Sequence, residues 1–201
     1  ARRIFNQLSA RIAVSEAAAW TGRRWFGGDY TIVPNGVDVE AAHTGPKTPS
    51  EEMRLLFVGR AEERKGLPVL LAAFQALVEL VPARLTVIGA EPDEVSRGIA
   101  DPDVLEHIEV RGKVSDEQLW AALAEADVLV APSLAGESFG MVLIEAMASG
   151  TPPVASAIAG YSDVVTNGVD GVLVPPADPQ ALGEELLSLW HEPERRVALG
   201  E

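Results

Sequence analysis

Residues 127–150 read DVLVAPSLAGESFGMVLIEAMASG, and this stretch decides the fold. It joins an apolar run of strand length, a loop containing Pro, Gly and Ser, and an apolar segment of helix length. Gly150 closes it at the position where a helix commonly ends in a left-handed residue. Units of the same kind recur along the chain, and this alternation is typical of βαβ units. The sequence therefore predicts an α/β fold built on a parallel sheet.

Eight short runs have the composition of strands. They are residues 11–14, 30–33, 54–58, 84–88, 107–111, 127–131, 153–155 and 171–174. Most are apolar on both faces, as expected of a sheet that helices cover on both sides. The apolar residues from Leu67 to Val81 follow a helical spacing, which predicts a helix there. Ser115 with Gln118 forms a capping box, and Asp178 is an N-cap ahead of a proline, so two further helices begin at these points.

The chain of 201 residues can form one sizeable domain or two small ones. Residues 34–50 are rich in turn formers and lack periodicity, which is typical of a connector. We expect residues 1–38 to be the end of a preceding domain with its connector, and residues 39–201 to form the main domain. The chain begins with Ala rather than Met, and residues 197–201 have the pattern of a helix. We therefore expect a piece of a longer protein, truncated at its C-terminal end.

Composition and charge exclude several classes of function. Sixteen Lys and Arg against thirty Asp and Glu give a net charge of −14, which disfavours binding to nucleic acid or to anionic lipid. The chain has no Cys, so disulfides, thiol nucleophiles and cysteine zinc sites are excluded, and a cytoplasmic location is expected. No run approaches the roughly 20 apolar residues of a bilayer span, so we expect no membrane insertion by this chain.

Two glutamates flank the start of the helix predicted in the opening stretch. Glu137 lies in the loop and Glu145 inside the helix, which would separate their backbones by about 12 Å at 1.5 Å per helical residue. The N–H groups of residues 139–142 lie between them, where a helix N-terminus favours phosphate. Carboxylates accept hydrogen bonds from sugar and ribose hydroxyls, so the pattern suits a nucleoside diphosphate sugar. In the alternative interpretation, Glu137 only favours the helix dipole and Glu145 faces solvent.

A second cluster, residues 59–66, joins a predicted strand to the next helix. Its Arg60 and Lys65 are placed where the carboxyl end of a strand meets a helix N-terminus, the usual anion site of an open parallel sheet. The alternative is a solvated loop in which these cations pair with Glu62 and Glu63. The chain has neither a Walker loop nor a G-x-G-x-x-G fingerprint, which disfavours ATPases and dehydrogenases.

Two other patterns carry little weight. Asp101-Pro102-Asp103 is similar to a metal-binding carboxylate pair, but it lies in a turn, so a helix cap explains it better and we expect no metal. The three His residues lie apart from both clusters, which gives Ser-His-Asp chemistry no support.

Taken together, these motifs resemble those of a known family. Residues 137–147, ESFGMVLIEAM, resemble the E-x7-E motif of retaining GT-B glycosyltransferases of group 1, the GT4-like type. Residues 58–60 with 65–66 resemble the family's phosphate motif, and 34–38 and 167–175 match as well, so the resemblance covers nearly the whole chain. A finer resemblance, to phosphatidylinositol mannosyltransferases, rests on residues 12–15, 64–73 and 136–140.

The resemblance implies a two-domain enzyme of which this chain is the C-terminal half of a GT-B fold, a Rossmann-like parallel sheet with helices on both faces. As catalytic residues it implies Arg60 and Lys65 on the diphosphate and Glu137 on the transferred sugar. The donor-binding residues that it implies are Gly59, Val114 against the base, Ser138, Phe139, Gly140, Met141, Val142 and, on the ribose, Glu145. The N-terminal half of the family pattern, with its glycine-rich loop, acceptor site and histidine, is absent from this sequence.

The function expected from this resemblance is retaining transfer of a hexose from a GDP- or UDP-sugar to an acceptor hydroxyl, with GDP-mannose as first choice. No cofactor is expected besides the donor, and the fragment alone is expected to be inactive. The acceptor, for example a lipid-linked one, would be bound by the missing N-terminal domain, at the inner face of the membrane. The alternatives are a non-catalytic nucleotide-sugar binding module, or an epimerase or phosphorylase of the same architecture.

Overall fold

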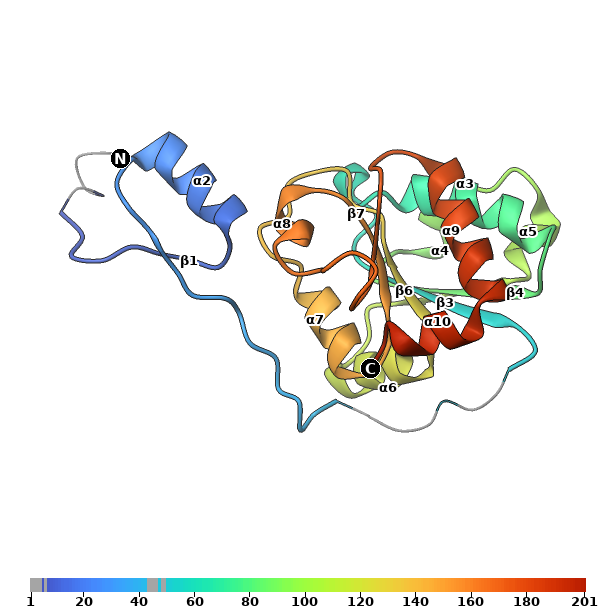
Figure 1. Cartoon of the computed structure of the whole chain (residues 1–201). Coiled ribbons are helices and arrows are strands. Elements are labelled where there is room, and N and C mark those ends of the chain that lie inside the picture. Colours follow the sequence, from blue (N-terminus) through green and yellow to red (C-terminus); the bar gives the residue numbers. More distant parts are fainter. Residues whose placement is uncertain (1–4, 6, 43–46, 48–49) are drawn as a thin grey trace.

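Six parallel strands form the main sheet, in the order β5-β4-β3-β6-β7-β8. The computed structural model describes residues 5, 7–42, 47 and 50–201, so the first residues of the chain and parts of the predicted connector lie outside it. The strands are β3 (Met53–Val58), β4 (Ala83–Ile88), β5 (Ile108–Gly112), β6 (Val128–Ala131), β7 (Pro153–Ser156) and β8 (Val172–Val174). This order is that of a Rossmann-like doubly wound sheet, so the predicted fold class is confirmed (Figure 1).

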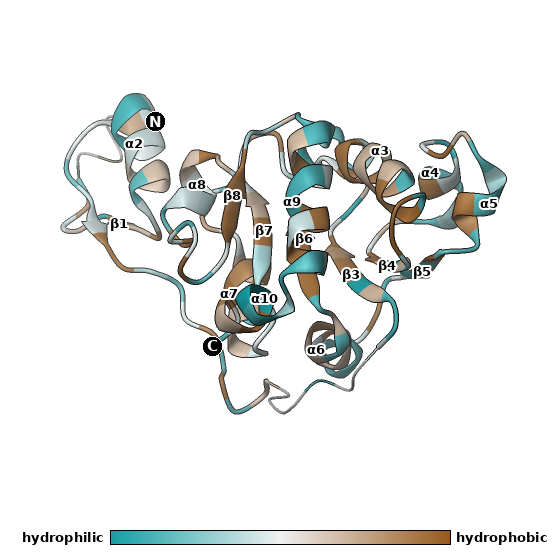
Figure 2. Ribbon diagram, turned by 45° about the vertical axis from the view of Figure 1, so that its right-hand side comes forward, coloured by the Kyte–Doolittle hydropathy of each residue, from teal (hydrophilic) through white to brown (hydrophobic). Residues whose placement is uncertain are grey.

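Helices cover both faces of the sheet because successive strand residues point to opposite sides. On one face, Leu55 belongs to a core that also contains residues of α3 (Leu67–Val78) and α9 (Pro179–His191). On the other, Leu56 belongs to a core with α6 (Asp116–Glu125), α7 (Met141–Ala148) and α8 (Ala159–Ser162). Three shorter helices, α4 (Pro92–Ser96), α5 (Pro102–Leu105) and α10 (Pro193–Ala198), also follow strands of this sheet or α9 along the chain. Figure 2 shows the apolar residues gathered between these layers.

Local sequence signals correctly predicted three helix boundaries. The Ser115 capping box is present, the Asp178 side chain accepts the Ala181 N–H at 2.9 Å, and Gly150 is left-handed with φ of 67°. The prediction of a helix through Val81 was wrong: α3 ends at Val78, consistent with Pro82 disfavouring the helical conformation of the residue before it.

One further detail of the prediction needs correction. Residues 197–201 are not helical throughout, because α10 ends at Ala198, two residues before the poor helix former Gly200. Strand β5 is the exception to the expected burial on both faces: its residues alternate between half-buried and exposed. It lies at the edge of the sheet, where one face stays open to solvent.

The segment before the connector forms a small unit of its own. Strands β1 (Ile12–Ala13) and β2 (Thr31–Ile32) pair in parallel, and α2 (Glu16–Phe26) lies between them in the sequence. The two strands do not join the main sheet. Figure 1 shows α2 outside the layered body, on the side where α8 lies.

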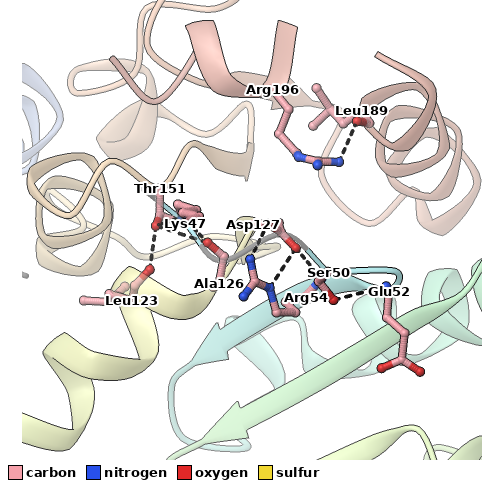
Figure 3. Close-up of polar contacts among 10 residues, drawn as sticks. All are labelled: Lys47, Ser50, Glu52, Arg54, Leu123, Ala126, Asp127, Thr151, Leu189 and Arg196. Atoms are coloured by element: carbon pink, nitrogen blue, oxygen red, sulfur yellow. Dashed lines mark hydrogen bonds and ion pairs between the residues drawn. The ribbon is translucent and has the colours of Figure 1, made fainter. Parts of the chain in front are cut away.

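At the amino edge of the sheet, a buried polar cluster anchors Lys47 of the connector (Figure 3). Lys47 Nζ donates to the Ala126 carbonyl and lies 2.6 Å from Thr151 Oγ1. Beside it, Arg54 holds Asp127 through two side-chain hydrogen bonds of 2.9 and 3.1 Å. Burial lowers the pKa of Lys47 to about 8, an effect that Asp127 opposes and the positive charge of Arg54 reinforces.

This lowered pKa predicts a stability that rises with pH. Between about 8 and 10.5, the unfolded chain keeps a proton on Lys47 that the folded chain has released, so the free energy of unfolding increases with pH. Above pH 10 the effect is opposed, because burial raises the pKa of Tyr161 to about 12 and the unfolded tyrosine ionises first. Urea unfolding of the wild type and of Lys47→Met, from about pH 7.5 to 9.5, measures the difference. If the free energy of unfolding changes with pH in the same way for both proteins, Lys47 is not buried as described.

Candidate functional site

The site lies where the strand order reverses. Strand β3 leads into α3 on one face of the sheet and the neighbouring β6 leads into α7 on the other, so their loops diverge at the carboxyl edge and leave a crevice. The two loops approach each other closely: the Leu134 N–H donates to the Arg64 carbonyl at 2.8 Å. Gly66 is left-handed with φ of 71°, and a Cβ there would lie 1.9 Å from the Pro132 carbonyl oxygen. Only glycine permits this approach.

Glu137 is the centre of the contacts between the two loops. Its Oε1 lies 2.7 Å from Lys65 Nζ and 2.8 Å from Arg64 Nη1, and its side chain is only 11% exposed. Ser133 Oγ approaches the same oxygen at 3.4 Å. Two cations therefore face one carboxylate, while Oε2 has no hydrogen-bond partner within the described part of the chain. That oxygen remains available to accept a hydrogen bond.

Arg60 is placed differently from Lys65. Its side chain is 75% exposed and pairs with Glu62 at 2.5 Å, and Arg64 Nε also contacts Glu62, at 2.8 Å. Arg60 thus forms one of the ion pairs that the alternative interpretation expected, whereas Lys65 is 22% exposed and reaches Glu137. Gly59, at the start of the loop, donates its N–H to the Ile88 carbonyl at 2.9 Å, which places it beside β4.

The start of α7 offers unpaired N–H groups next to Glu137. Gly140 is the N-cap, left-handed with φ of 91°, and no side chain caps this helix. Leu143 donates to the Gly140 carbonyl at 2.9 Å, whereas the N–H groups of residues 139–142 have no acceptor among the described residues. A helix N-terminus of this kind can bind a phosphate oxygen. The helix begins only at Met141, so the predicted separation of about 12 Å, which assumed helix from residue 137 onward, does not apply.

Glu145 lies further along α7 and is half-buried rather than solvent-facing. Burial raises its pKa above 4.5, and the negative charge of Asp116 adds to the effect. Asp116 is the first residue of α6, and Val114 lies two residues before it. Val114 packs against the same core as α7. The structure thus brings Glu145 near Asp116, two residues after Val114.

The raised pKa of Glu145 makes a prediction about stability and binding. The folded chain holds this proton more tightly than the unfolded chain, so the free energy of unfolding falls as pH rises above 4.5. At pH 7 we expect Glu145→Gln to raise the melting temperature. If Glu145 accepts a ribose hydroxyl, the same change should weaken nucleotide-sugar binding about tenfold, because bonds to a charged acceptor are about twice as strong. Thermal melts measure the stability and calorimetry measures the affinity, with Glu51→Gln, at an exposed residue, as control. A lower melting temperature would contradict the burial of Glu145, and an unchanged affinity would contradict its contact with the ribose.

Sequence reasoning missed several residues of the site. Arg64 stands beside Lys65, and its position in a cationic strand-to-helix loop was the only signal for it. Tyr161 and Ser133 share a hydrogen bond of 2.9 Å behind Glu137, and burial raises the pKa of Tyr161 to about 12. Ser15 donates to the Ser138 carbonyl from a segment 123 residues away. No local pattern announces contacts of this range.

Neither a metal site nor a membrane span is found among the described residues. No group of three or more His, Asp or Glu side chains in this part of the chain could hold a metal ion. The Asp101 side chain instead caps α5, accepting the Asp103 N–H at 3.0 Å. Over the same residues, no helix combines the length and the hydropathy that a bilayer-spanning segment needs.

Comparisons with known proteins agree with the fold. The family model "Glycosyl transferases group 1" matches residues 38–201. A phosphatidyl-myo-inositol mannosyltransferase from Mycobacterium leprae is 40% identical over 97% of this chain and 54% of its own length. The chain therefore spans about half the length of that relative.

Solved structures give the same result. Sucrose-phosphate synthase from Thermosynechococcus elongatus superposes with a TM-score of 0.86 and 28% identity, over the whole of this chain and 53% of that one. Anabaena HepE in complex with UDP and glucose superposes with a TM-score of 0.83 and 22% identity, over 99% of this chain and 59% of that one. The expected Rossmann-like sheet of a GT-B glycosyltransferase is confirmed. The chain belongs to the group 1 glycosyltransferase family, with the resemblance to phosphatidylinositol mannosyltransferases that its motifs predicted.

Proposed function

We propose that this chain is the donor-binding part of a retaining glycosyltransferase, which moves a hexose from a nucleoside diphosphate sugar to an acceptor hydroxyl. The observation that carries the proposal is the meeting of Lys65 and Arg64 with Glu137, beside the unpaired N–H groups that begin α7. Cations and N–H groups suit a diphosphate, and a carboxylate with a free oxygen suits a sugar hydroxyl. The family membership supports the same assignment.

In this proposal, the residues act mainly on the leaving group. Departure of the nucleoside diphosphate develops negative charge, which Lys65, Arg64 and the start of α7 would stabilise, with Arg60 reaching in from the exposed rim. Glu137 would hold the two cations through Oε1 and accept a sugar hydroxyl through Oε2. Glu145 would accept from the ribose, and Val114 would pack against the base. Gly59 and the backbone of residues 138–142 complete the proposed donor site.

The nucleotide and the transferred sugar are proposed at a finer level. The mannosyltransferase relative supports mannose, with GDP-mannose as the first candidate, and the HepE complex supports a uridine nucleotide as the second.

We propose that the donor-binding domain comprises residues 39–201, and that residues 1–38 end a preceding domain. The separate β1–β2 sheet and the family match from residue 38 support this division. The acceptor would be bound by that preceding domain, in a cytoplasmic enzyme.

Calorimetry of the 201-residue chain with UDP, GDP and ADP, and with their sugars, tests donor binding. We expect measurable heat with one base preferred. No heat with any of these ligands would overturn the donor-site assignment. An assay of the longer enzyme for sugar transfer, with the anomeric configuration of the product determined, separates a retaining transferase from a binding module or an epimerase.

A further inference from the structure

The loop between β6 and α7 is held by a residue from outside the donor domain. Ser15, at the start of α2, is 3% exposed. Its hydroxyl accepts the Ala18 N–H at 3.0 Å, as the N-cap of α2, and donates to the Ser138 carbonyl. One buried hydroxyl therefore both begins α2 and contacts the backbone of the proposed donor site.

A second contact fixes the same arrangement. The Ala17 N–H donates to Asp163 Oδ2 at 2.9 Å, and Asp163 directly follows α8. Helix α8 packs on the donor loop without room to spare, since a Cβ on Gly160 would lie 2.1 Å from the Glu137 carbonyl oxygen. The start of α2 thus holds the loop at Ser138 and holds the helix that lies against it. A cavity of about 920 Å³ remains beside these contacts, between α2, the loop and α8.

The bond to Ser138 has a direct consequence for the next residue. The Ser138 carbonyl and the Phe139 N–H belong to one planar trans peptide unit, in which they point in opposite directions. A hydrogen bond that fixes the carbonyl toward α2 therefore fixes the Phe139 N–H away from it. That N–H is the first of the unpaired donors at the start of α7.

We infer that Ser15 is a positioning residue for the donor site, which orients the Phe139 N–H toward a donor phosphate only while α2 is docked on the loop. The inference rests on the proposed function for the nature of the ligand. Because Ser15 lies in the segment assigned to the preceding domain, the arrangement of that segment would control the affinity of the donor site. Withdrawal of α2 would free the peptide unit and weaken binding.

The test compares four forms of the 201-residue chain: the wild type, Ser15→Ala, Ser15→Thr and Asp178→Ala. Thr retains the hydroxyl, and Asp178→Ala removes the N-cap of α9, so it controls for the loss of a cap by itself. Nitrogen-15 relaxation of the Phe139 and Gly140 amides measures orientation without any ligand. We expect their order parameters to fall from about 0.85 toward the flexible range below about 0.6 in Ser15→Ala alone.

Calorimetry with UDP and GDP gives the second readout. We expect Ser15→Ala to weaken binding of the preferred nucleotide about tenfold, the effect of one hydrogen bond to a charged group, whereas Thr and Asp178→Ala retain it. Unchanged order parameters in Ser15→Ala, in a chain whose circular dichroism shows it folded, would overturn the positioning role. If the wild type binds none of UDP, GDP, ADP and their sugars, the proposed function fails, and the relaxation data still decide whether Ser15 orders the loop.

Discussion

Replacing Lys65 by Ala is expected to lower kcat/KM for sugar transfer by about 10²- to 10³-fold, the usual effect of removing one preorganised donor from a developing anion. Lys65 is the better buried of the two cations on Glu137, with a side chain 22% exposed against 40% for Arg64. Its charge is therefore less screened by water than that of a surface lysine. The same change removes one of the two cations that neutralise Glu137. Steady-state kinetics of the longer enzyme, and nucleotide affinity of this chain, both measure the effect.

Two control variants make this prediction specific. Arg84→Ala removes a cation at the amino edge of the sheet, where Arg84 pairs with Glu52 at 3.3 Å, and should leave transfer unchanged. Arg60→Ala should have a smaller effect than Lys65→Ala, because the Arg60 side chain is 75% exposed and its ion pair is with Glu62 rather than with Glu137. Wild-type kcat/KM in Lys65→Ala would exclude this lysine as a diphosphate ligand.

Replacing Gly66 by Ala is expected to destabilise the fold by about 3 kcal/mol. A left-handed non-glycine residue costs about 1–2 kcal/mol, and overpacking adds about 1–3 kcal/mol. The overpacking arises because the new Cβ would lie 1.9 Å from the Pro132 carbonyl oxygen, which forces the two site loops apart. A thermal melt should show a decrease of about 6–12 °C, at about 2–4 °C per kcal/mol for a domain of this size. Nucleotide binding should be lost as well, because one loop carries Arg64 and Lys65 and the other carries Glu137, which they contact.

Substitutions at two other glycines separate the cost of the left-handed backbone from the cost of overpacking. Gly168 is left-handed with φ of 76°, but a Cβ added there would meet nothing within 4 Å, so Gly168→Ala should show only the backbone cost. Gly183 lies inside α9 with ordinary contacts of 3.7 Å or more, and Gly183→Ala should stabilise the helix by about 1 kcal/mol. If Gly66→Ala lowers the free energy of unfolding no more than Gly168→Ala does, the two loops do not meet as described.

The sequence was a good guide to the sheet because its strands are nearly all buried. The run at β6 could be recognised without tertiary information, since all four of its residues are buried. Periodicity failed where another effect was stronger: α3 stops at Val78 although the apolar pattern continues to Val81. The strand predicted over residues 107–111 is present as β5, although it is an edge strand that solvent reaches on one side.

The candidate site could be predicted only in outline. The sequence placed Lys65 and Glu137 in loops that follow two different strands, and because parallel strands end at one edge of a sheet, the structure brings the two side chains together. Which cation would touch Glu137 depended on loop geometry, and this favoured Lys65 and Arg64 over Arg60. The contact of Ser15 with Ser138 was beyond prediction, because it depends on how the α2 segment docks on the domain.

A titration of the nitrogen-15 labelled chain with UDP and GDP tests most directly whether the crevice between the two loops binds a donor. For one of the two nucleotides, the largest chemical-shift changes should fall on the amides of residues 139–142 and on Lys65 and Gly66, with smaller changes near Val114 and Glu145. Saturable changes confined to any other surface, or none at millimolar nucleotide, would contradict the proposed donor site.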